Sequence, residues 1–249
     1  MKVDLSIVSH GQGFLVEKLL KDLARYQDSF DKIVITLNVP ESDFDVDVLL
    51  QDKIVYVHND TPAGFGANHN AAVALCESEI VCILNPDLRV ESSPFDNLLE
   101  TVSRQGVSLV GPRILSVDGK EEENVRPFIT LPDIIEKVFS RTSSRSDTDY
   151  STRTFCVPYP VDWVGGMFMM VRKDAFTAVG GFDEHFFLYY EDVDLCARFK
   201  KAGWIVMYDP RTNVIHDARR DSHTKMRYLK WHSASMLRYF LKHGFFGFK

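Results

Sequence analysis

The stretch Ile80-Val81-Cys82-Ile83-Leu84-Asn85-Pro86-Asp87 decides the fold: five apolar residues are followed at once by polar ones. A short, continuous apolar run of this kind is typical of a strand buried on both faces, as in a parallel sheet covered by helices. Ligands of such sheets bind beyond the carboxyl ends of the strands. We therefore expect the sheet to hold Asp87 rigidly where a substrate or a hard cation can reach it.

The sequence on both sides of this stretch alternates short strands with helices. In the first half we predict strands at 3–8, 32–37, 53–58, 79–84 and 108–111, and helices at 13–26, 66–76 and 95–104. In the second half we predict a strand at 161–172, a helix from 174, a helix at 192–202 and strands at 204–208 and 213–215. This order indicates an α/β domain with a largely parallel sheet, helices on both faces and a mixed sheet in the second half.

Composition sets wide limits on the class of protein. A chain of 249 residues with 45% hydrophobic and 26% charged residues fits one globular α/β domain and excludes a disordered or fibrous chain. No run approaches the roughly 18 apolar residues that cross a bilayer, and the N-terminus reads as a strand, not a signal peptide. The four cysteines form no C-x-x-C pair, which favours reduced thiols and a cytoplasmic location.

The segment 219–249 differs from the rest of the chain in charge: it carries eight Lys/Arg and one acid, whereas the remainder carries 21 bases and 34 acids. On a helical wheel for 223–243, one side is apolar and contains Met226, Leu229, Met236, Leu237 and Phe240. The other side carries bases among aromatic residues, namely Arg227, Tyr228, Trp231, Arg238, Tyr239 and Lys242. We predict a basic amphipathic helix whose apolar side packs on the domain and whose basic side meets an anionic membrane surface. This charge distribution argues against a nucleic-acid binder.

Polar residues follow the first four predicted strands. They are Ser9-His10-Gly11, Asn38, Asn59-Asp60 and Asn85-Pro86-Asp87. Turns favour Asn, Asp and Gly, so any one of these ends has a structural explanation. Together they indicate a shared ligand site, in which Asp87 is suited to a divalent cation that also binds a diphosphate.

Two further patterns suggest chemistry. The stretch 64–70 (GFGANHN) precedes a helix, where glycines let a ligand approach the backbone and the helix start favours anions. Aromatic residues at 186–190 lead into Glu191 and Asp192 at a second helix start. Acids there are often only caps, but apolar surroundings raise the proton affinity of a carboxylate and so suit a general base. His216, at the end of a strand, is a structural histidine or, beside an ion, a ligand.

Several motifs occur in an order that resembles a known family: Val8-Ser9-His10-Gly11, Gly64-Phe65-Gly66-Ala67-Asn68, Leu84-Asn85-Pro86-Asp87, Trp163-Val164-Gly165-Gly166, Gly181-Phe182-Asp183-Glu184, Tyr190-Glu191-Asp192-Val193-Asp194-Leu195 and Val214-Ile215-His216. Together they resemble the family 2 inverting glycosyltransferases of GT-A fold, and in particular the bacterial rhamnosyltransferases of O-antigen and cell-wall glycan synthesis. The resemblance covers nearly the whole chain.

The resemblance implies a role for each matching residue. Asp192 is the implied catalytic base, with Glu191 beside it. Asp87 and His216 are the implied ligands of a divalent metal, Mg²⁺ or Mn²⁺. The implied donor-binding residues are Ser9, His10, Gly11, Asn38, Gly66, Asn68, Asn85 and Asp87, and the implied acceptor-binding residues are Trp163, Gly165 and Gly166.

Two residues depart from the family pattern. Leu37-Asn38 stands where relatives have Asp-Asn, which removes the acid that contacts the nucleotide base. Asn85 stands where many relatives carry an acid, which predicts weaker metal binding.

The resemblance also implies substrates and a location. The donor would be dTDP-L-rhamnose and the acceptor a saccharide on a polyprenyl diphosphate, reached from the cytoplasm by peripheral contact with the inner face of the cell membrane. We divide the chain into a transferase domain at 1–218, with a nucleotide-sugar half at about 1–110 and an acceptor half at about 111–218, and the tail at 219–249. The alternatives are a family 2 transferase using a UDP-hexose or UDP-galactofuranose, a sugar-nucleotide pyrophosphorylase, and a non-enzymatic nucleotide-sugar-binding module.

Overall fold

The computed structural model describes residues 3–42, 44, 46–132, 156–217 and 226–245. Its strands are β1 (Val3–Ser9), β2 (Phe30–Leu37), β3 (Ile54–His58), β4 (Ile80–Leu84), β5 (Leu88–Arg89), β6 (Val107–Ser116), β7 (Val125–Arg126), β8 (Tyr159–Val161), β9 (Trp163–Val164), β10 (Phe168–Arg172) and β11 (Ile205–His216). Its α-helices are α1 (Gly13–Ala24), α2 (Phe65–Leu75), α3 (Phe95–Val102), α5 (Lys173–Ala178), α6 (Glu191–Lys201) and α7 (Met226–His243).

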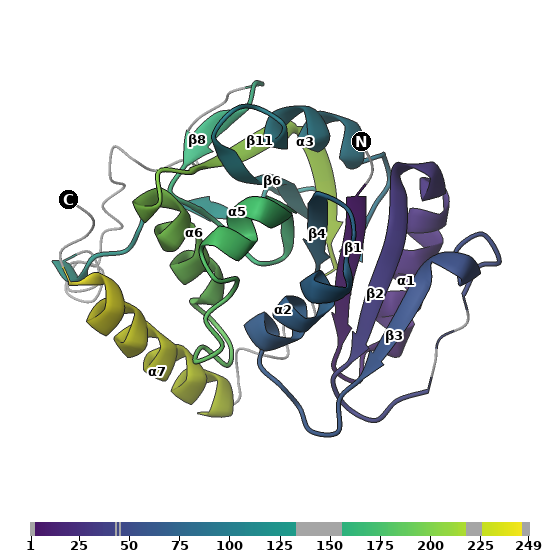
Figure 1. The fold of residues 1–249 in the computed structure, drawn as a ribbon, viewed down its shortest axis with the longest axis horizontal. Helices are drawn as coiled ribbons and strands as arrows, with labels where there is room; N and C mark the ends of the chain where they lie inside the picture. Colours follow the sequence, from purple (N-terminus) through teal and green to yellow (C-terminus); the bar gives the residue numbers. More distant parts are fainter. Residues whose placement is uncertain (1–2, 43, 45, 133–155, 218–225, 246–249) are drawn as a thin grey trace.

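One large mixed sheet forms the centre of the molecule, in the order β3-β2-β1-β4-β10-β6-β11-β5, with β8 paired to β11 (Figure 1). Strands β1 to β4 are parallel, β10 runs antiparallel to β4 and β6, and β6 is parallel to β11. A parallel first half and a mixed second half confirm the predicted α/β architecture.

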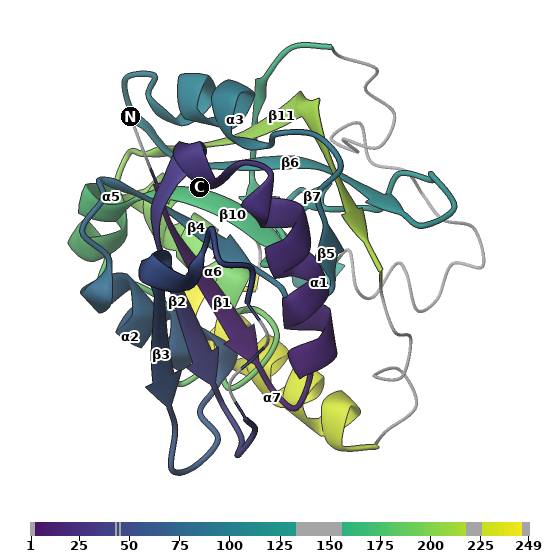
Figure 2. The same ribbon diagram turned by 90° about the vertical axis from the view of Figure 1, so that its right-hand side faces the viewer.

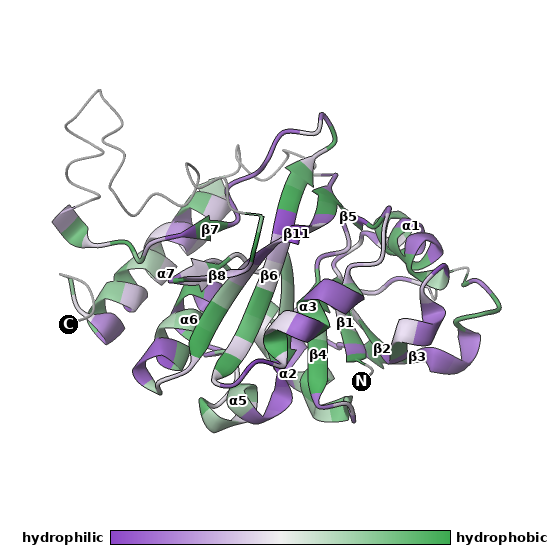
Figure 3. Ribbon diagram, turned by 90° about the horizontal axis from the view of Figure 1, so that it is seen from above, coloured by the Kyte–Doolittle hydropathy of each residue, from purple (hydrophilic) through white to green (hydrophobic). Residues whose placement is uncertain are grey.

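Helices cover both faces of this sheet, because successive side chains of each buried strand point to opposite faces. In β4, Ile80, Cys82 and Leu84 pack with α1 and α3 on one face, whereas Val81 and Ile83 pack with α2, α5, α6 and α7 on the other. Figure 2 shows α1 and α2 on opposite sides of β1 and β2. In Figure 3 the central strands β4, β6 and β11 are coloured mostly as hydrophobic residues.

The second half differs from the prediction in detail. The predicted strand at 161–172 is three short strands in two sheets, because β9 pairs with β7 while β8 and β10 belong to the large sheet. The predicted strands at 204–208 and 213–215 are one long strand, β11, whose register against β6 shifts between Asp209 and Asn213. Apolar periodicity does not reveal either feature, since both depend on which strand lies alongside.

Helix α7 forms as predicted but turns a different side to the domain, and residues 219–225 and 246–249 of the tail lie outside the described part. Tyr239 and Phe240 are buried, whereas Leu229 and Leu237 are 61% and 55% exposed. Aromatic contacts explain the rotation: Trp231 lies 4.8 Å from Phe187, ring centroid to ring centroid, and Tyr239 lies 5.5 Å from Tyr190.

A buried carboxylate holds the end of α7 against α6. Asp194 is fully buried and accepts hydrogen bonds from Arg198 Nε at 2.8 Å and His243 Nε2 at 2.7 Å, and it pairs with Lys242 Nζ at 2.8 Å. Burial alone would raise the pKa of Asp194, but His243, Arg198 and Lys242 outweigh it and lower that pKa. The tail helix is therefore part of the domain's structure. No helix among the described residues is long and apolar enough to cross a membrane.

Candidate active site

The carboxyl ends of β1, β2 and β3 meet in a network of amide side chains. Asn38 Nδ2 lies 3.1 Å from His10 Nδ1 and donates to Ala63 O at 3.0 Å. Asn59 Nδ2 donates to Asn38 Oδ1 at 2.9 Å and to Asn68 Oδ1 at 2.7 Å. The network thus ties the polar ends of β1, β2 and β3 to the start of α2, and a shared ligand site at these ends stays a prediction.

Most of these polar groups are occupied within the protein. Asn38 and Asn68 are buried, and their amides hold the loop before α2. Buried Ser9 accepts from Gln12 N at 3.2 Å, and exposed Gly11, at φ +75°, donates to Glu41 Oε1 at 3.0 Å. Direct donor contacts by these residues stay a prediction, and the geometry shows them shaping the loops.

The glycine loop before α2 packs against the segment that precedes the catalytic candidates. A Cβ on Gly66 would lie 2.6 Å from Phe182 Cβ, and one on Gly64 would lie 2.8 Å from Phe187 O. Phe65 N donates to that same oxygen at 3.0 Å. These glycines therefore allow close packing between α2 and the 182–187 segment.

The segment 166–167 connects Asp192 to the end of β4 by backbone hydrogen bonds. Asn85 N donates to Met167 O at 2.9 Å, and the neighbouring Gly166 N donates to Asp192 Oδ2 at 3.0 Å. Val193 N donates to Asp192 Oδ1 at 2.8 Å. A Cβ on Gly166 would lie 3.2 Å from the Phe65 ring and 3.8 Å from Asp192 Cβ, so a glycine suits this contact.

Glu191 and Asp192 differ in the hydrogen bonds and charges that surround their carboxyl groups. Burial and repulsion from Asp192 raise the pKa of Glu191 well above its ordinary value, and its Oε2 has no hydrogen-bond partner among the described residues. Burial also raises the pKa of Asp192, but the two backbone N–H groups and the charge of Arg126 oppose this. The backbone N–H groups favour the charged form of Asp192, and Glu191 Oε2 has no such donor, so Asp192 is the better general base of the pair.

The turn that presents this pair is strained. Tyr189 and Tyr190 both adopt left-handed backbone conformations, at φ +71° and +68°. Such conformations cost bulky residues of order 1–3 kcal/mol each and persist where surrounding contacts enforce them. Here α7 supplies those contacts: Ser235 Oγ donates to Leu188 O at 2.9 Å, and His232 packs against both tyrosine rings.

The predicted acceptor residues lie beside Asp192, with one difference. Gly165 N donates to Asn124 O at 2.8 Å and adjoins Gly166, but Trp163 is only 8% exposed and donates Nε1 to Pro127 O at 3.1 Å. The Trp163 ring thus packs in the core, and its acceptor role stays a prediction. The Arg126 guanidinium lies 5.8 Å from the centre of that ring and places a cation near Asp192.

Asp87, after the end of β4, and His216, at the end of β11, lie close together; their role as metal ligands stays a prediction. Asp87 Oδ2 lies 3.3 Å from His216 Nε2, and His216 Nδ1 lies 2.7 Å from Glu122 Oε2. Burial lowers the pKa of His216, but Asp87 and Glu122 outweigh it and raise that pKa to about 9. Without a metal, His216 is therefore an imidazolium between two carboxylates.

The donor atoms fit a weakly held divalent ion. Asp87 Oδ1 is buried and makes no hydrogen bond to any described residue. Carboxylate oxygen and imidazole nitrogen are common ligands of Mn²⁺, and carboxylate suits Mg²⁺. Within the described ranges no cluster of three or more such residues is arranged to hold an ion. Asp87 and His216 would therefore bind a metal together with the phosphates of a donor.

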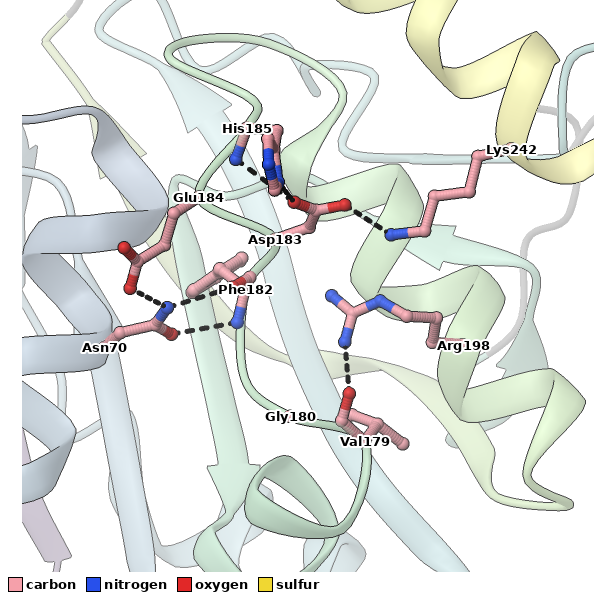
Figure 4. A pocket seen from close by; sticks show the side chains of 9 residues that line it. All are labelled: Asn70, Val179, Gly180, Phe182, Asp183, Glu184, His185, Arg198 and Lys242. Atoms are coloured by element: carbon pink, nitrogen blue, oxygen red, sulfur yellow. Dashed lines mark hydrogen bonds and ion pairs between the residues drawn. The ribbon is translucent and has the colours of Figure 1, made fainter.

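A pocket of about 460 Å³ is lined by the turn at 179–185 together with Asn70 of α2, Arg198 of α6 and Lys242 of α7 (Figure 4). In it, Asn70 of α2 donates to Phe182 O and Glu184 Oε1, each at 2.9 Å, and Lys242 of α7 reaches Asp183 at 2.6 Å. Its lining includes none of the predicted site residues. These contacts join α2 and α7 to the turn at 179–185, and Arg198 of α6 donates to Val179 O of the same turn at 2.6 Å.

Sequence reasoning missed three residues that lie beside the candidate site residues. Arg126 stands in a short strand after an unpredicted hairpin, and the acidic run 121–123 that contains Glu122 reads as a solvated turn. Asn124, which contacts Gly165, follows directly. The sequence signal in this region is the concentration of charged residues at 120–126, which does not predict the residues that they contact.

Known proteins resemble the chain in sequence. The family described as glycosyl transferase family 2 matches residues 7–180, and the N-terminal domain of galactosyltransferase matches residues 148–218. Rhamnosyltransferase WbbL of Escherichia coli (strain K12) is 30% identical over 256 residues, covering 95% of this chain and 92% of WbbL. The N-acetylglucosaminyl-diphospho-decaprenol L-rhamnosyltransferase of Mycobacterium tuberculosis (strain ATCC 25618 / H37Rv) is 33% identical over 147 residues, covering 55% of this chain and 46% of that protein. The chain thus matches about half the length of the mycobacterial relative.

Solved structures resemble it in fold. GalNAc-T7 with UDP, GalNAc and Mn²⁺ gives a TM-score of 0.66 at 13% identity, covering 88% of this chain and 44% of that one. The mannosyltransferase PcManGT of Pyrobaculum calidifontis with GDP-Man and Mn²⁺ gives 0.61 at 14% identity, covering 95% and 64%. These likenesses show the predicted GT-A fold.

Proposed function

The chain belongs to glycosyl transferase family 2, and from that premise we propose that it transfers L-rhamnose from dTDP-L-rhamnose to a saccharide carried on a polyprenyl diphosphate. The relatives named as rhamnosyltransferases support the sugar, and the name of the mycobacterial relative supports a lipid-linked acceptor. The observation that carries a transferase chemistry is the Asp192 carboxylate, half-buried beside Gly166 and close to the end of β4.

The chemistry follows from the position of this base. An acceptor hydroxyl attacks the anomeric carbon from the face opposite the nucleotide, and Asp192 takes its proton. The new carbon–oxygen bond forms as the bond to the diphosphate breaks, and the electron pair leaves with the nucleoside diphosphate. Configuration at the anomeric carbon is therefore inverted. The backbone N–H groups of Gly166 and Val193 orient Asp192 for this proton transfer.

A divalent metal would supply positive charge to the departing diphosphate. The structural relatives were solved with Mn²⁺, which supports this proposal. Asp87 and His216 would hold the ion together with the donor phosphates, as the unpartnered Asp87 Oδ1 suggests.

Donor choice is tested with a panel of nucleotide sugars. The assay contains Mn²⁺ and a saccharide carried on a polyprenyl diphosphate as acceptor. We expect dTDP-L-rhamnose to give acceptor-dependent release of nucleoside diphosphate at least about 100-fold faster than UDP-hexoses or UDP-galactofuranose. A site that hydrogen-bonds its own substrate rejects analogues by large factors, because its buried polar groups would stay unpaired. Faster release from a UDP-sugar would assign a different donor within the same family. Pyrophosphate-dependent formation of a nucleoside triphosphate would instead indicate a pyrophosphorylase.

We also propose that the outward side of α7 docks on the inner face of the cell membrane. This side carries four apolar residues that are at least half exposed: Met226 (72%), Leu229 (61%), Leu237 (55%) and Leu241 (70%). Lys230 and Arg238 are exposed beside them, and the helix contains no acid. Apolar side chains with flanking bases favour an anionic bilayer, since each base adds about 1 kcal/mol near such a surface.

Flotation with liposomes tests this docking. The pair Leu237→Gln and Leu241→Gln should weaken binding to phosphatidylglycerol vesicles about tenfold or more, because each leucine loses about 1 kcal/mol or more of apolar burial. The matched control is Val48→Gln with Leu49→Gln, two exposed apolar residues before β3. Equal binding by both double variants, or none by the unchanged protein, would remove the membrane from the proposal. Transfer to a soluble acceptor should be unaffected.

A further inference from the structure

The end of β11 lies between two segments that each bring a carboxylate to His216. On one side, Leu88 of β5 pairs with His216 in antiparallel register, and Asp87 directly precedes Leu88. Asp217 N donates to Asp87 O at 2.8 Å, so the hydrogen bonding between these two segments continues past the Leu88–His216 pair. The position of Asp87 relative to His216 is therefore set by backbone hydrogen bonds.

On the other side, a hairpin after β6 returns Glu122 to the same place. Ser116, at the end of β6, pairs with His216 in parallel register, and the chain then reverses through Gly119 at φ +74°. Ser116 N donates to Lys120 O at 2.8 Å, and Glu122 N donates to Ile114 O at 2.9 Å. These backbone hydrogen bonds thus fix the position of Glu122 beside the imidazole of His216.

We propose that Glu122 is a positioning residue for the metal ligand His216: its carboxylate accepts the Nδ1–H of the imidazole and so directs Nε2 toward Asp87 as the ligand nitrogen. This inference rests on the proposed metal site. Glu122 itself would not touch the ion, because it lies at the ring nitrogen opposite Asp87.

The geometry supports this role through the two ring nitrogens. Nδ1 lies 2.7 Å from Glu122 Oε2 and Nε2 lies 3.3 Å from Asp87 Oδ2, so each nitrogen has one carboxylate. A carboxylate at one nitrogen fixes the tautomer and the ring orientation and makes the other nitrogen a stronger ligand. Mutation of such partners typically lowers metal affinity 10–100-fold. A purely structural salt bridge would instead affect the stability of the hairpin alone.

Binding of Mn²⁺, followed by electron paramagnetic resonance in the presence of dTDP and separately of UDP, tests the proposal without any sugar transfer. Glu122→Ala should weaken Mn²⁺ binding about 10–100-fold. Glu122→Gln should lose less, because its amide oxygen still accepts the Nδ1–H. The matched control is Glu121→Gln, which removes the neighbouring charge but alters a hydrogen bond to Tyr208 instead. We expect this control to change Mn²⁺ affinity no more than about twofold.

A second readout separates positioning from folding. Nitrogen-15 shifts of His216 with Zn²⁺, a diamagnetic ion that takes imidazole ligands, and dTDP should show the Nδ1–H tautomer in the unchanged protein and a mixture in Glu122→Ala. Unchanged Mn²⁺ affinity in Glu122→Ala, or an equal loss in Glu121→Gln, would overturn the proposal. So would unchanged affinity in His216→Ala, or no Mn²⁺ binding with either nucleotide. A protein that binds Mn²⁺ through this pair yet does not use dTDP-L-rhamnose would overturn the donor alone.

Discussion

Asp192→Asn should lower the rate of transfer about 10²–10⁴-fold, the usual contribution of a general base. The amide cannot take the acceptor proton, but its oxygen still accepts a hydrogen bond from Gly166 or Val193. The fold should therefore persist. Initial rates with saturating donor and acceptor, together with thermal unfolding, give the measurement.

Asp174→Asn is the matched control. Asp174 also lies in the first turn of a helix and also accepts from the next backbone N–H, that of Ala175 at 2.7 Å, but it lies on the surface in an ion pair with Arg172. The control should keep its activity. A loss below tenfold in Asp192→Asn, with folding intact, would assign the proton to another group.

The pH dependence of the unchanged enzyme should agree with the same base. Burial raises the pKa of Asp192 above its ordinary value of 3.8, and a protonated carboxyl cannot accept the proton. The rate should thus fall with decreasing pH at a pH above that ordinary value. Because Glu191 and Asp192 titrate together, the profile reports the pair.

Asp87→Asn, or removal of metal with EDTA, should abolish most of the activity. Charge stabilisation by a metal is worth several kcal/mol in a transition state, and each 1.36 kcal/mol is tenfold in rate. We therefore expect a loss of at least about 100-fold, with weaker donor binding in calorimetry. Asn keeps the shape of the side chain and one carbonyl oxygen but removes the charge.

Asp118→Asn serves as its control, since Asp118 is exposed in the turn of the hairpin that carries Glu122. It should not alter donor binding or metal dependence. Full activity of the unchanged protein in excess EDTA would exclude the proposed role of Asp87 and His216 in holding a metal.

The fold of the first half could be predicted from sequence because its signals are local. The apolar runs 80–84 in β4 and 33–35 in β2 are buried on both faces, so a continuous apolar pattern identifies them. In β1, apolar Val3, Leu5 and Ile7 alternate with polar residues, which is also a strand pattern. The second half depends on pairing between distant segments. Thus 161–172 splits between two sheets, and α7 turns Tyr239 inward because of Tyr190, which no periodicity of the tail reveals.

The candidate site shows the same division. Asp192, Asp87 and His216 were found because they follow strands or begin helices in recognisable motifs, and the structure brings Asp87 to His216 and Asp192 to Gly166. Roles that depend on exposure were not accessible in the same way. The resemblance implies an acceptor role for Trp163, but the motif does not reveal its burial, which follows from the packing of β9 between β7 and α6.

The most direct test of an inverting transfer catalysed at Asp192 is the configuration of the product. One-bond carbon–proton coupling at the anomeric carbon, measured by NMR for the donor dTDP-L-rhamnose and for the glycoside made from it, distinguishes the two outcomes. A single attack by the acceptor, with Asp192 as base, predicts that the product has the configuration opposite to that of the donor. A product with the donor's configuration would contradict it, because retention requires a second displacement or attack from the nucleotide's own side.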